Sequence, residues 1–269
     1  MTNRNGRVSI LSGQTDPGAL DADLARLHLD SAESVAAGRN ITAGYARGWG
    51  LEYGGVGEFV AADPVYRESV GMARSRSLLL EHKLMNLFLI MKYGARDDEG
   101  DFVEFGSYRG GSAIFMANVA RRLGLKGTVY ALDTYEGMPD TNDELDLHFA
   151  GNFSDTNLDD LKSCIRELGL TNIEPVKGLF SDTAPGVLRR IRSIRLAHID
   201  CDIHDAVRYC LDAVMPKMSQ SSGYVVLDDP LHGSCLGAMQ AVEEWIIDTK
   251  LHAEQAYPHL VYRYPPVRA

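Results

Sequence analysis

The chain has 269 residues, 45% of them hydrophobic, and a formal net charge of −10. This length and apolar content allow one large α/β domain with an appendage, or two small domains. The acidic balance excludes nucleic acid and anionic membranes as expected partners, because both carry negative charge.

The cysteines and the apolar segments indicate a cytoplasmic protein. None of the four cysteines belongs to a C-x-x-C pair, which disfavours a zinc knuckle or a thioredoxin-like site and indicates reduced thiols. The N-terminus lacks the long apolar core of a signal peptide. The longest apolar run, residues 84–91, is too short to cross a bilayer.

Residues 1–66 are irregular in pattern and rich in Gly and Ala. We expect helical pieces and loops here, forming a lid or an oligomer contact. From residue 64 to residue 93 the spacing of apolar residues becomes helical. Residues 67–269 are predicted to form one domain, and the whole protein a homo-oligomer, a dimer or a tetramer.

After residue 100 the chain alternates between strand and helix patterns. The strand candidates are "DFVEF", "GTVYAL", "IEPVKG", "IRLAHID" and "GYVVLDD", and the helices between and after them end near Gly or Pro. This alternation predicts a mostly parallel sheet with helices on both faces. In such sheets a ligand binds at the carboxyl ends of the strands, where the strand order reverses.

The first of these turns is "EFGSYRGGS". Tyr108 stands where a dinucleotide-binding loop needs its second glycine, and no G-K-[ST] follows, so the turn fits neither NAD nor ATP. Glu104 would also repel a phosphate. The turn suits a phosphate-free, cationic nucleoside such as S-adenosylmethionine (SAM); the alternative is a turn that only packs the helix on the strand.

The next two strand ends also bear polar side chains. Asp133, 22 residues after Gly111, is placed to accept hydrogen bonds from a ribose, although a helix-capping or turn aspartate would look the same. Asp182, in "GLFSDT", could accept a bond from an adenine amine or cap the following helix. We leave both alternatives open for Asp182.

Three aspartates end the fourth and fifth strands: Asp200, Asp228 and Asp229. Carboxylates this close repel one another and raise one another's pKa unless a cation lies between them. An all-oxygen set of this kind suits Mg²⁺ or Ca²⁺. The alternative is a set of unrelated loop acids paired with arginines.

The histidines offer candidates for a catalytic base. His204 is the nearest in sequence to the acidic cluster, and His148 lies in an acidic insertion before the third helix. A lone histidine is more often a packed or solvated residue than a base, so the sequence alone does not choose between these roles.

Five segments of the chain together resemble the macrocin O-methyltransferase family. They are "VEFGSYRGG", "ALDTYEGMP", "GLFSDTAP", the stretch from "LAHIDCDIHDAVRYC" through "VVLDD", and "AMQAVEEW". The similarity runs in order from Glu68 to Trp245. Members are class I SAM-dependent enzymes that methylate sugar hydroxyls on antibiotics such as tylosin and mycinamicin; a rhamnose methyltransferase of enediyne biosynthesis is a relative. The first turn is also similar to that of catechol O-methyltransferase.

The resemblance implies a Rossmann-like class I methyltransferase sheet and a role for each matching residue. It places the methionine end of SAM at the first turn, the ribose on Asp133, the adenine near residues 180–182, and Mg²⁺ or another divalent cation on the three aspartates. The implied cofactor-binding residues are Glu104, Gly106, Ser107, Tyr108, Ser112, Asp133, Phe180, Ser181, Asp182 and Asp200. The implied metal ligands are Asp200, Asp228 and Asp229, and the catalytic candidates are Asp200, His204 and His148.

The chain departs from the family pattern at residues 105–107, at residues 200–205 and at Pro230, where an aromatic residue is usual. These departures leave the acceptor and the retention of the metal site open. The expected function is metal-dependent methylation of a sugar hydroxyl on a small glycosylated acceptor in antibiotic biosynthesis. The alternatives are a catechol or phenol O-methyltransferase and a non-catalytic SAM-binding protein; an NAD-dependent dehydrogenase lacks its Tyr-x-x-x-Lys pair and its glycine loop.

Overall fold

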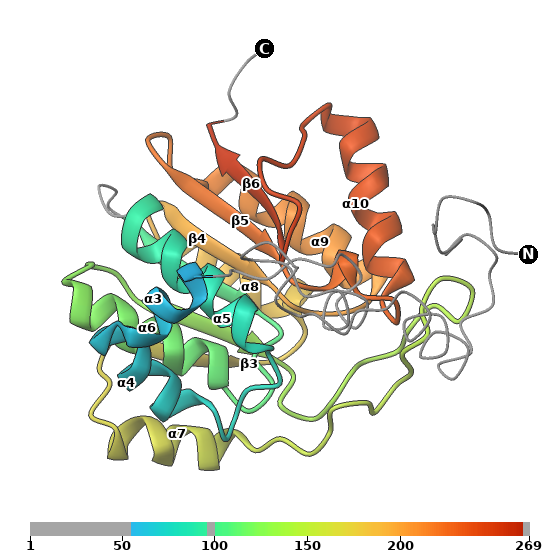
Figure 1. Cartoon of the computed structure of the whole chain (residues 1–269). Coiled ribbons are helices and arrows are strands. Elements are labelled where there is room, and N and C mark those ends of the chain that lie inside the picture. The colour runs from blue at the N-terminus through green and yellow to red at the C-terminus, as the bar shows by residue number, and fades with distance from the viewer. Residues whose placement is uncertain (1–54, 96–99, 266–269) are drawn as a thin grey trace, which may run out of the picture. The chain divides into compact units, whose positions relative to one another are not determined.

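The computed structural model describes residues 55–95 and 100–265 (Figure 1). The chain divides into two units, residues 1–61 and residues 62–269. Within the first unit, the described part is residues 55–61, which belong to helix α3 (Gly55–Ala62). The expected lid or oligomer contact over residues 1–66 therefore lies largely outside the described residues and stays a prediction.

The second unit is built on a six-stranded sheet in the order β3-β2-β1-β4-β5-β6 (Figure 1). Neighbours from β3 to β5 are parallel, and β6 pairs with β5 in the antiparallel direction. The strands are β1 (Asp101–Phe105), β2 (Val129–Asp133), β3 (Ile173–Lys177), β4 (Ile194–Ile199), β5 (Gly223–Leu227) and β6 (Leu260–Tyr264). The mostly parallel sheet is confirmed, and β6 is a strand that the sequence pattern missed.

Two groups of helices cover the sheet. Strand order runs one way from β1 to β3 and the other way from β4 to β5, so right-handed crossovers place the connecting helices on opposite faces. The first group is α4 (Pro64–Ala73), α5 (Glu81–Leu89), α6 (Gly111–Leu123) and α7 (Leu158–Glu167). The second is α8 (Phe180–Arg190), α9 (His204–Val214) and α10 (Leu236–Thr249). None of the described helices is long and apolar enough to cross a membrane.

The helical pattern expected over residues 64–93 is divided in two. Asp63 caps α4 by accepting the backbone N–H of Val65 at 2.8 Å, and Pro64 takes the first helical position, where no N–H is needed. A non-helical segment, residues 74–80, then separates α4 from α5. Residues 76–80 line the cavity described below, so this break supplies one of its walls.

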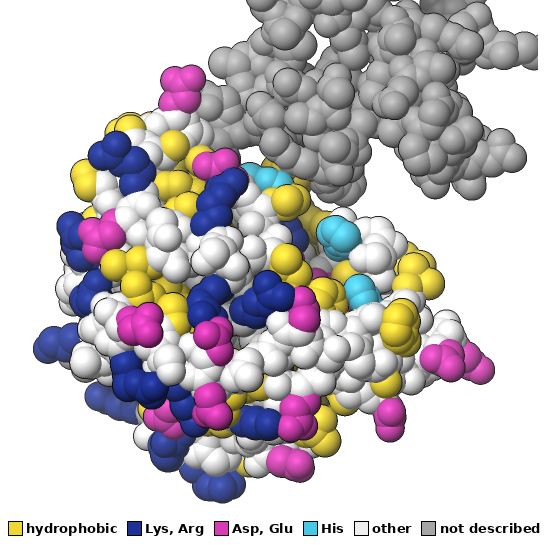
Figure 2. Space-filling model, turned by 90° about the horizontal axis from the view of Figure 1, so that it is seen from below, with side chains coloured by type: hydrophobic (Ala, Val, Ile, Leu, Met, Phe, Trp, Pro, Cys, Tyr) yellow, Lys and Arg dark blue, Asp and Glu magenta, His cyan; other side chains and the backbone are white. Residues whose placement is uncertain are grey.

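Short 3₁₀ and π turns complete the described elements. A π turn, Ile90–Gly94, extends α5, and 3₁₀ turns cover Met215–Lys217 and Asp229–Leu231. On the face shown in Figure 2, basic and acidic side chains are interspersed. Because the charges are mixed, that face has no large positively charged surface to which nucleic acid would bind.

Gly106, directly after β1, allows two strand ends to meet. Its φ is +87°, and a Cβ added there would lie 1.6 Å from the carbonyl oxygen of Asp200. A side chain is therefore excluded both by backbone conformation and by lack of space. The glycine brings the turn after β1 directly against the loop after β4.

We predict that Gly106→Ala lowers the free energy of unfolding by about 3 kcal/mol or more, because strain and a backbone clash add. Gly124→Ala is the matched control: its φ is +70°, but nothing lies within 4 Å of the added Cβ. Strain alone should cost about 1 kcal/mol there. Urea unfolding of both variants checks this, and equal losses would contradict it.

Candidate functional site

A cavity of about 300 Å³ lies at the carboxyl ends of the central strands. Its walls come from the turn after β1, the loops after β2, β4 and β5, and the start of α8, together with residues 76–80 and Lys83. Strand order reverses between β1 and β4. The cavity therefore occupies the place where open α/β sheets bind their ligands.

Most of the expected cofactor-binding residues line this cavity. They are Gly106, Ser107, Tyr108, Ser112, Asp133, Phe180 and Asp200. Three expected residues do not: Glu104, Ser181 and Asp182. Ser181 and Asp182 lie exposed in the first turn of α8, where the Ser181 hydroxyl is 3.3 Å from a carboxylate oxygen of Asp182.

Glu104 lies within the sheet. Its side chain is fully buried, and Oε1 is 3.0 Å from Nδ1 of His198 on β4, its partner in the strand register. We expected Glu104 to line the methionine end of SAM, because it lies two residues before Gly106. The last residues of a buried strand still alternate between the two faces, and this alternation, not the proximity to the turn, decides where the side chain points.

Asp133 joins two turns at the cavity wall. One carboxylate oxygen accepts the backbone N–H of Tyr108 at 2.7 Å, and the other accepts that of Tyr135 at 2.7 Å. Tyr108 and Tyr135 both have a positive φ of 51°, so these bonds hold strained turns in place. Burial outweighs these bonds and raises the pKa of Asp133.

Asp200, Asp228 and Asp229 come together, as the sequence analysis expected. One carboxylate oxygen from each lies within 4.8 Å of the others, and all three residues line the cavity. Burial, and next the charges of Asp228 and Asp229, raise the pKa of Asp200 well above its usual range. Within the described residues, the carboxylate of Asp200 makes no side-chain hydrogen bond, so its oxygens are free to bind a ligand.

Asp228 is held on both sides by residues that the sequence analysis did not single out. Lys83 of α5 forms an ion pair with Oδ2, and Nε2 of His259 lies 3.0 Å from Oδ1. Asn86 Nδ2 donates to Nδ1 of His259, so the His259 proton is on Nε2 and is donated to Asp228. Burial would raise the pKa of Asp228, but the His259 bond and the Lys83 charge hold it below its usual range.

Asp229 has a different environment. Its Oδ2 accepts the backbone N–H groups of Cys201 at 2.9 Å and Asp202 at 2.8 Å. Burial and the charges of Asp202 and Asp228 nevertheless raise its pKa well above the usual range. Negative charge in this region therefore exceeds what Lys83 alone compensates. An all-oxygen donor set with excess negative charge fits a hard divalent cation such as Mg²⁺.

The two candidate histidines have different surroundings. His148 lines the cavity, and its Nε2 lies 3.6 Å from a carboxylate oxygen of Asp202. His204 lies outside the cavity wall, with its ring between Asp205 and Glu244 at 2.7 and 3.0 Å. Although burial opposes protonation, these two carboxylates raise the pKa of His204. Its place at the start of α9 is that of a surface ion pair.

Comparison with known proteins gives a match to the family described as macrocin O-methyltransferase (TylF), over residues 76–256. The 8-demethyl-8-(2,3-dimethoxy-alpha-L-rhamnosyl)-tetracenomycin-C 4'-O-methyltransferase of Streptomyces olivaceus is 32% identical over 151 residues, which are 52% of this chain and 56% of the relative. A demethyldecarbamoylnovobiocin O-methyltransferase of Streptomyces niveus is 27% identical over 156 residues, 54% of this chain and 58% of the relative. The chain thus spans a little over half the length of these relatives.

Among solved structures, the O-methyltransferase NovP has a TM-score of 0.57 at 21% identity. The similarity covers 77% of this chain and 93% of NovP. The fold is therefore that of the class I SAM-dependent methyltransferases, as expected from the sequence.

We predict that Lys83→Met lowers the free energy of unfolding by about 3 kcal/mol in EDTA, because the buried carboxylate of Asp228 loses the ammonium group with which it forms an ion pair. Lys177→Met is the control, since the Lys177 and Glu136 side chains are 42% and 72% exposed and such pairs contribute about 0–1 kcal/mol. Denaturant unfolding measures both. Equal losses would show that the buried pair contributes no more than the exposed one.

Proposed function

Because the chain belongs to the macrocin O-methyltransferase family, we propose that it transfers the methyl group of SAM to a sugar hydroxyl of a glycosylated natural product. The family match, residues 76–256, includes all five parallel strands and every loop that lines the cavity. The observation that most supports the proposal is that the glycine turn, Asp133 and the three clustered carboxylates all line one cavity.

The cavity wall fits a nucleoside without phosphates. Gly106 lines the cavity, and because it has no Cβ the loop after β4 packs directly against it. Asp133 is preoriented by its two backbone bonds. Its Oδ1 also lies 3.4 Å from the Thr134 hydroxyl, so Oδ2 is the oxygen that keeps a lone pair for a ribose hydroxyl. Phe180 adds an apolar surface, itself packed edge-to-face on Phe105, against which adenine would lie.

Asp200 is our candidate for the group that takes the proton from the acceptor hydroxyl. Its carboxylate lines the cavity and lacks a side-chain hydrogen bond among the described residues. As the hydroxyl oxygen bonds to the methyl carbon and the carbon–sulfur bond breaks, the hydroxyl proton passes to Asp200 and then to solvent. We do not assign this role to His148, because its Nε2 faces Asp202 and Cys235.

Asp200, Asp228 and Asp229 would hold a divalent cation such as Mg²⁺, which would lower the pKa of a bound hydroxyl. Lys83 and His259 keep Asp228 ionised and oriented for this role. The same carboxylates fix the acceptor oxygen relative to the methyl group, which supplies the orientation part of catalysis.

The proposal of a glycosylated acceptor draws on the relatives and on the outer wall of the cavity. One relative is named for a rhamnosyl substrate and another for a novobiocin precursor. Leu78 and Leu80 line the cavity yet are 66% and 51% exposed. A sugar would lie among the carboxylates while these leucines contact the apolar body that bears it.

We predict that the protein binds SAM but not NAD in calorimetry, and that methyl transfer to a rhamnosylated acceptor stops in EDTA. Asp200→Asn should lower kcat by about 10²-fold or more, because the proton acceptor is lost. Asp212→Asn, an exposed change on α9, is the control and should leave activity unchanged.

Each other outcome identifies a rival. Absence of SAM binding would rule out the proposed function. Binding without transfer to any acceptor would indicate a non-catalytic SAM-binding protein, and transfer to catechol in preference to sugars would indicate a phenol methyltransferase. Transfer that is insensitive to EDTA would remove the metal from the proposal.

We also predict that Asp133→Ala weakens SAM binding about 10- to 100-fold, as expected when a buried hydrogen-bonding group is removed. Asp101→Ala is a matched control on the neighbouring strand β1. Asp101 also accepts a backbone N–H, that of Thr128 at 2.8 Å, but it is the first residue of β1 and does not line the cavity. Calorimetry should show unchanged affinity for this control, and equal losses in the two variants would refute the role of Asp133.

A further inference from the structure

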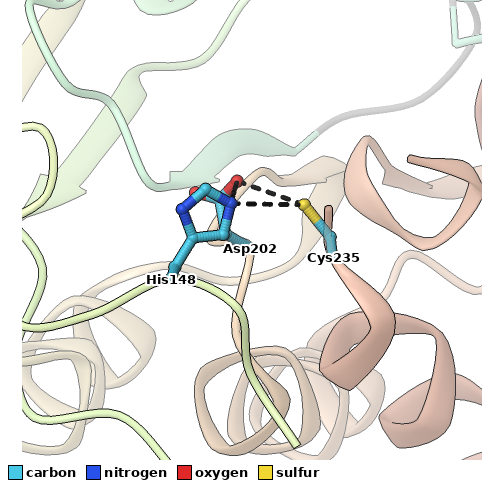
Figure 3. Close-up of side chains that lie close together, drawn as sticks. All are labelled: His148, Asp202 and Cys235. Atoms are coloured by element: carbon cyan, nitrogen blue, oxygen red, sulfur yellow. Dashed lines mark hydrogen bonds and ion pairs between the residues drawn. The ribbon is translucent and has the colours of Figure 1, made fainter. Parts of the chain in front are cut away.

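Three side chains of different chemistry meet beside the cavity, outside the three-aspartate cluster (Figure 3). His148 lies in the insertion between β2 and α7, and Asp202 lies in the loop after β4. Cys235 is the residue that directly precedes α10. Sγ of Cys235 lies 3.7 Å from Nε2 of His148 and 3.5 Å from Oδ1 of Asp202, and these last two atoms are 3.6 Å apart.

These separations match those of ligands around one metal ion. A tetrahedral zinc with bonds of about 2.0 Å to nitrogen or oxygen and about 2.3 Å to sulfur has ligand atoms about 3.3–3.6 Å apart. The three atoms form a nearly equilateral triangle with sides of 3.5–3.7 Å. The triangle therefore needs little change in shape to bind such an ion.

The hydrogen bonds of His148 leave a lone pair aimed at this triangle. Asn152 Oδ1 accepts the backbone N–H of Phe149 at 3.0 Å, which identifies that atom as an oxygen. Nδ1 of His148, 3.3 Å from the same oxygen, must then be the donor. In the neutral ring Nε2 is left as an acceptor, the arrangement in which an outer partner orients a metal-bound histidine.

Without an ion, the triangle has too few protons for its acceptors. Nε2 of His148, Oδ1 of Asp202 and, at 3.9 Å, Oδ1 of Asp229 all face the Cys235 sulfur, which has one proton to donate. The two carboxylates also oppose a free thiolate at this place, which argues against Cys235 as a nucleophile. A bound cation would satisfy the lone pairs and balance the charge together.

We propose that Nε2 of His148, Oδ1 of Asp202 and Sγ of Cys235 form a second metal site, for Zn²⁺ or a similar borderline-soft divalent ion. Nitrogen and sulfur ligands distinguish it from the oxygen-only aspartate cluster, which prefers a harder ion. Three protein ligands leave one position open, the ligand count of catalytic zinc sites. His148 and Asp202 line the cavity, so an oxygen atom of a molecule bound there could occupy that position.

The test uses the full-length protein with excess Mg²⁺ to occupy the aspartate cluster, and Co²⁺ as a spectroscopic substitute for Zn²⁺. We expect one equivalent of Co²⁺ to produce a sulfur-to-cobalt charge-transfer band and the strong visible bands of a tetrahedral ion, and Zn²⁺ to abolish both. Wild-type protein that shows no charge-transfer band at saturating Co²⁺ would overturn the proposal without any variant.

Variants locate the site. Cys235→Ser should abolish the charge-transfer band, and His148→Ala should weaken Co²⁺ binding by at least the about 10- to 100-fold that loss of an outer-shell partner costs. Cys164→Ser, a partly exposed cysteine on α7, is the matched control and should retain the band. Asp228→Asn should also retain it, which separates this site from the aspartate cluster.

Two results would refute the assignment: a band that persists in Cys235→Ser, or one that disappears in Cys164→Ser. The His148 side chain is 18% exposed, so His148→Ala is expected to fold even if Cys235→Ser does not. Unchanged Co²⁺ affinity in folded His148→Ala would then also refute the site. None of these readouts depends on methyl transfer, so the site stands or falls separately from the proposed function.

Discussion

The ion pair between Lys83 and Asp228 is the interaction on which the candidate site depends. It places a positive charge from α5 among the buried carboxylates that follow β4 and β5. Without that charge, burial and mutual repulsion would favour protonated acids, which bind cations poorly. Because Lys83 and His259 keep Asp228 ionised while Asp200 and Asp229 have raised pKa values, the cluster is divided into one fixed anion and two groups that respond to a ligand.

Asp229 links the proposed aspartate site for Mg²⁺ to the proposed second metal site. Asp229 belongs to the oxygen cluster through one carboxylate oxygen, and its Oδ1 faces the Cys235 sulfur at 3.9 Å. A cation at either place would lower the electrostatic cost of ionising Asp229. The oxygen cluster and the triangle of His148, Asp202 and Cys235 are therefore neighbours that share one region of negative charge, although their ligand types favour different metals.

Local patterns predicted the five parallel strands and the helices between them, because alternation of buried strands with helices requires a parallel sheet. They also predicted that Asp133, Asp200, Asp228 and Asp229 would line one cavity, since the carboxyl ends of parallel strands share an edge. The misses have physical causes. Strand β6 is as long as β5 and pairs with it in the antiparallel direction, so it does not belong to the parallel pattern from which the other strands were predicted. Glu104 was expected beside SAM, but its side chain is buried and contacts His198 on the neighbouring strand.

The five parallel strands, the glycine turn after the first of them and the strand-end acids could be predicted from the sequence, because each depends on residues close together in the chain. The groups that neutralise those acids became known from the folded structure. Lys83 lies 145 residues before Asp228, and His148 lies 87 residues before Cys235. The state of a buried charge depends on its neighbours in space, and long-range packing sets those neighbours without leaving a periodic signal in the chain.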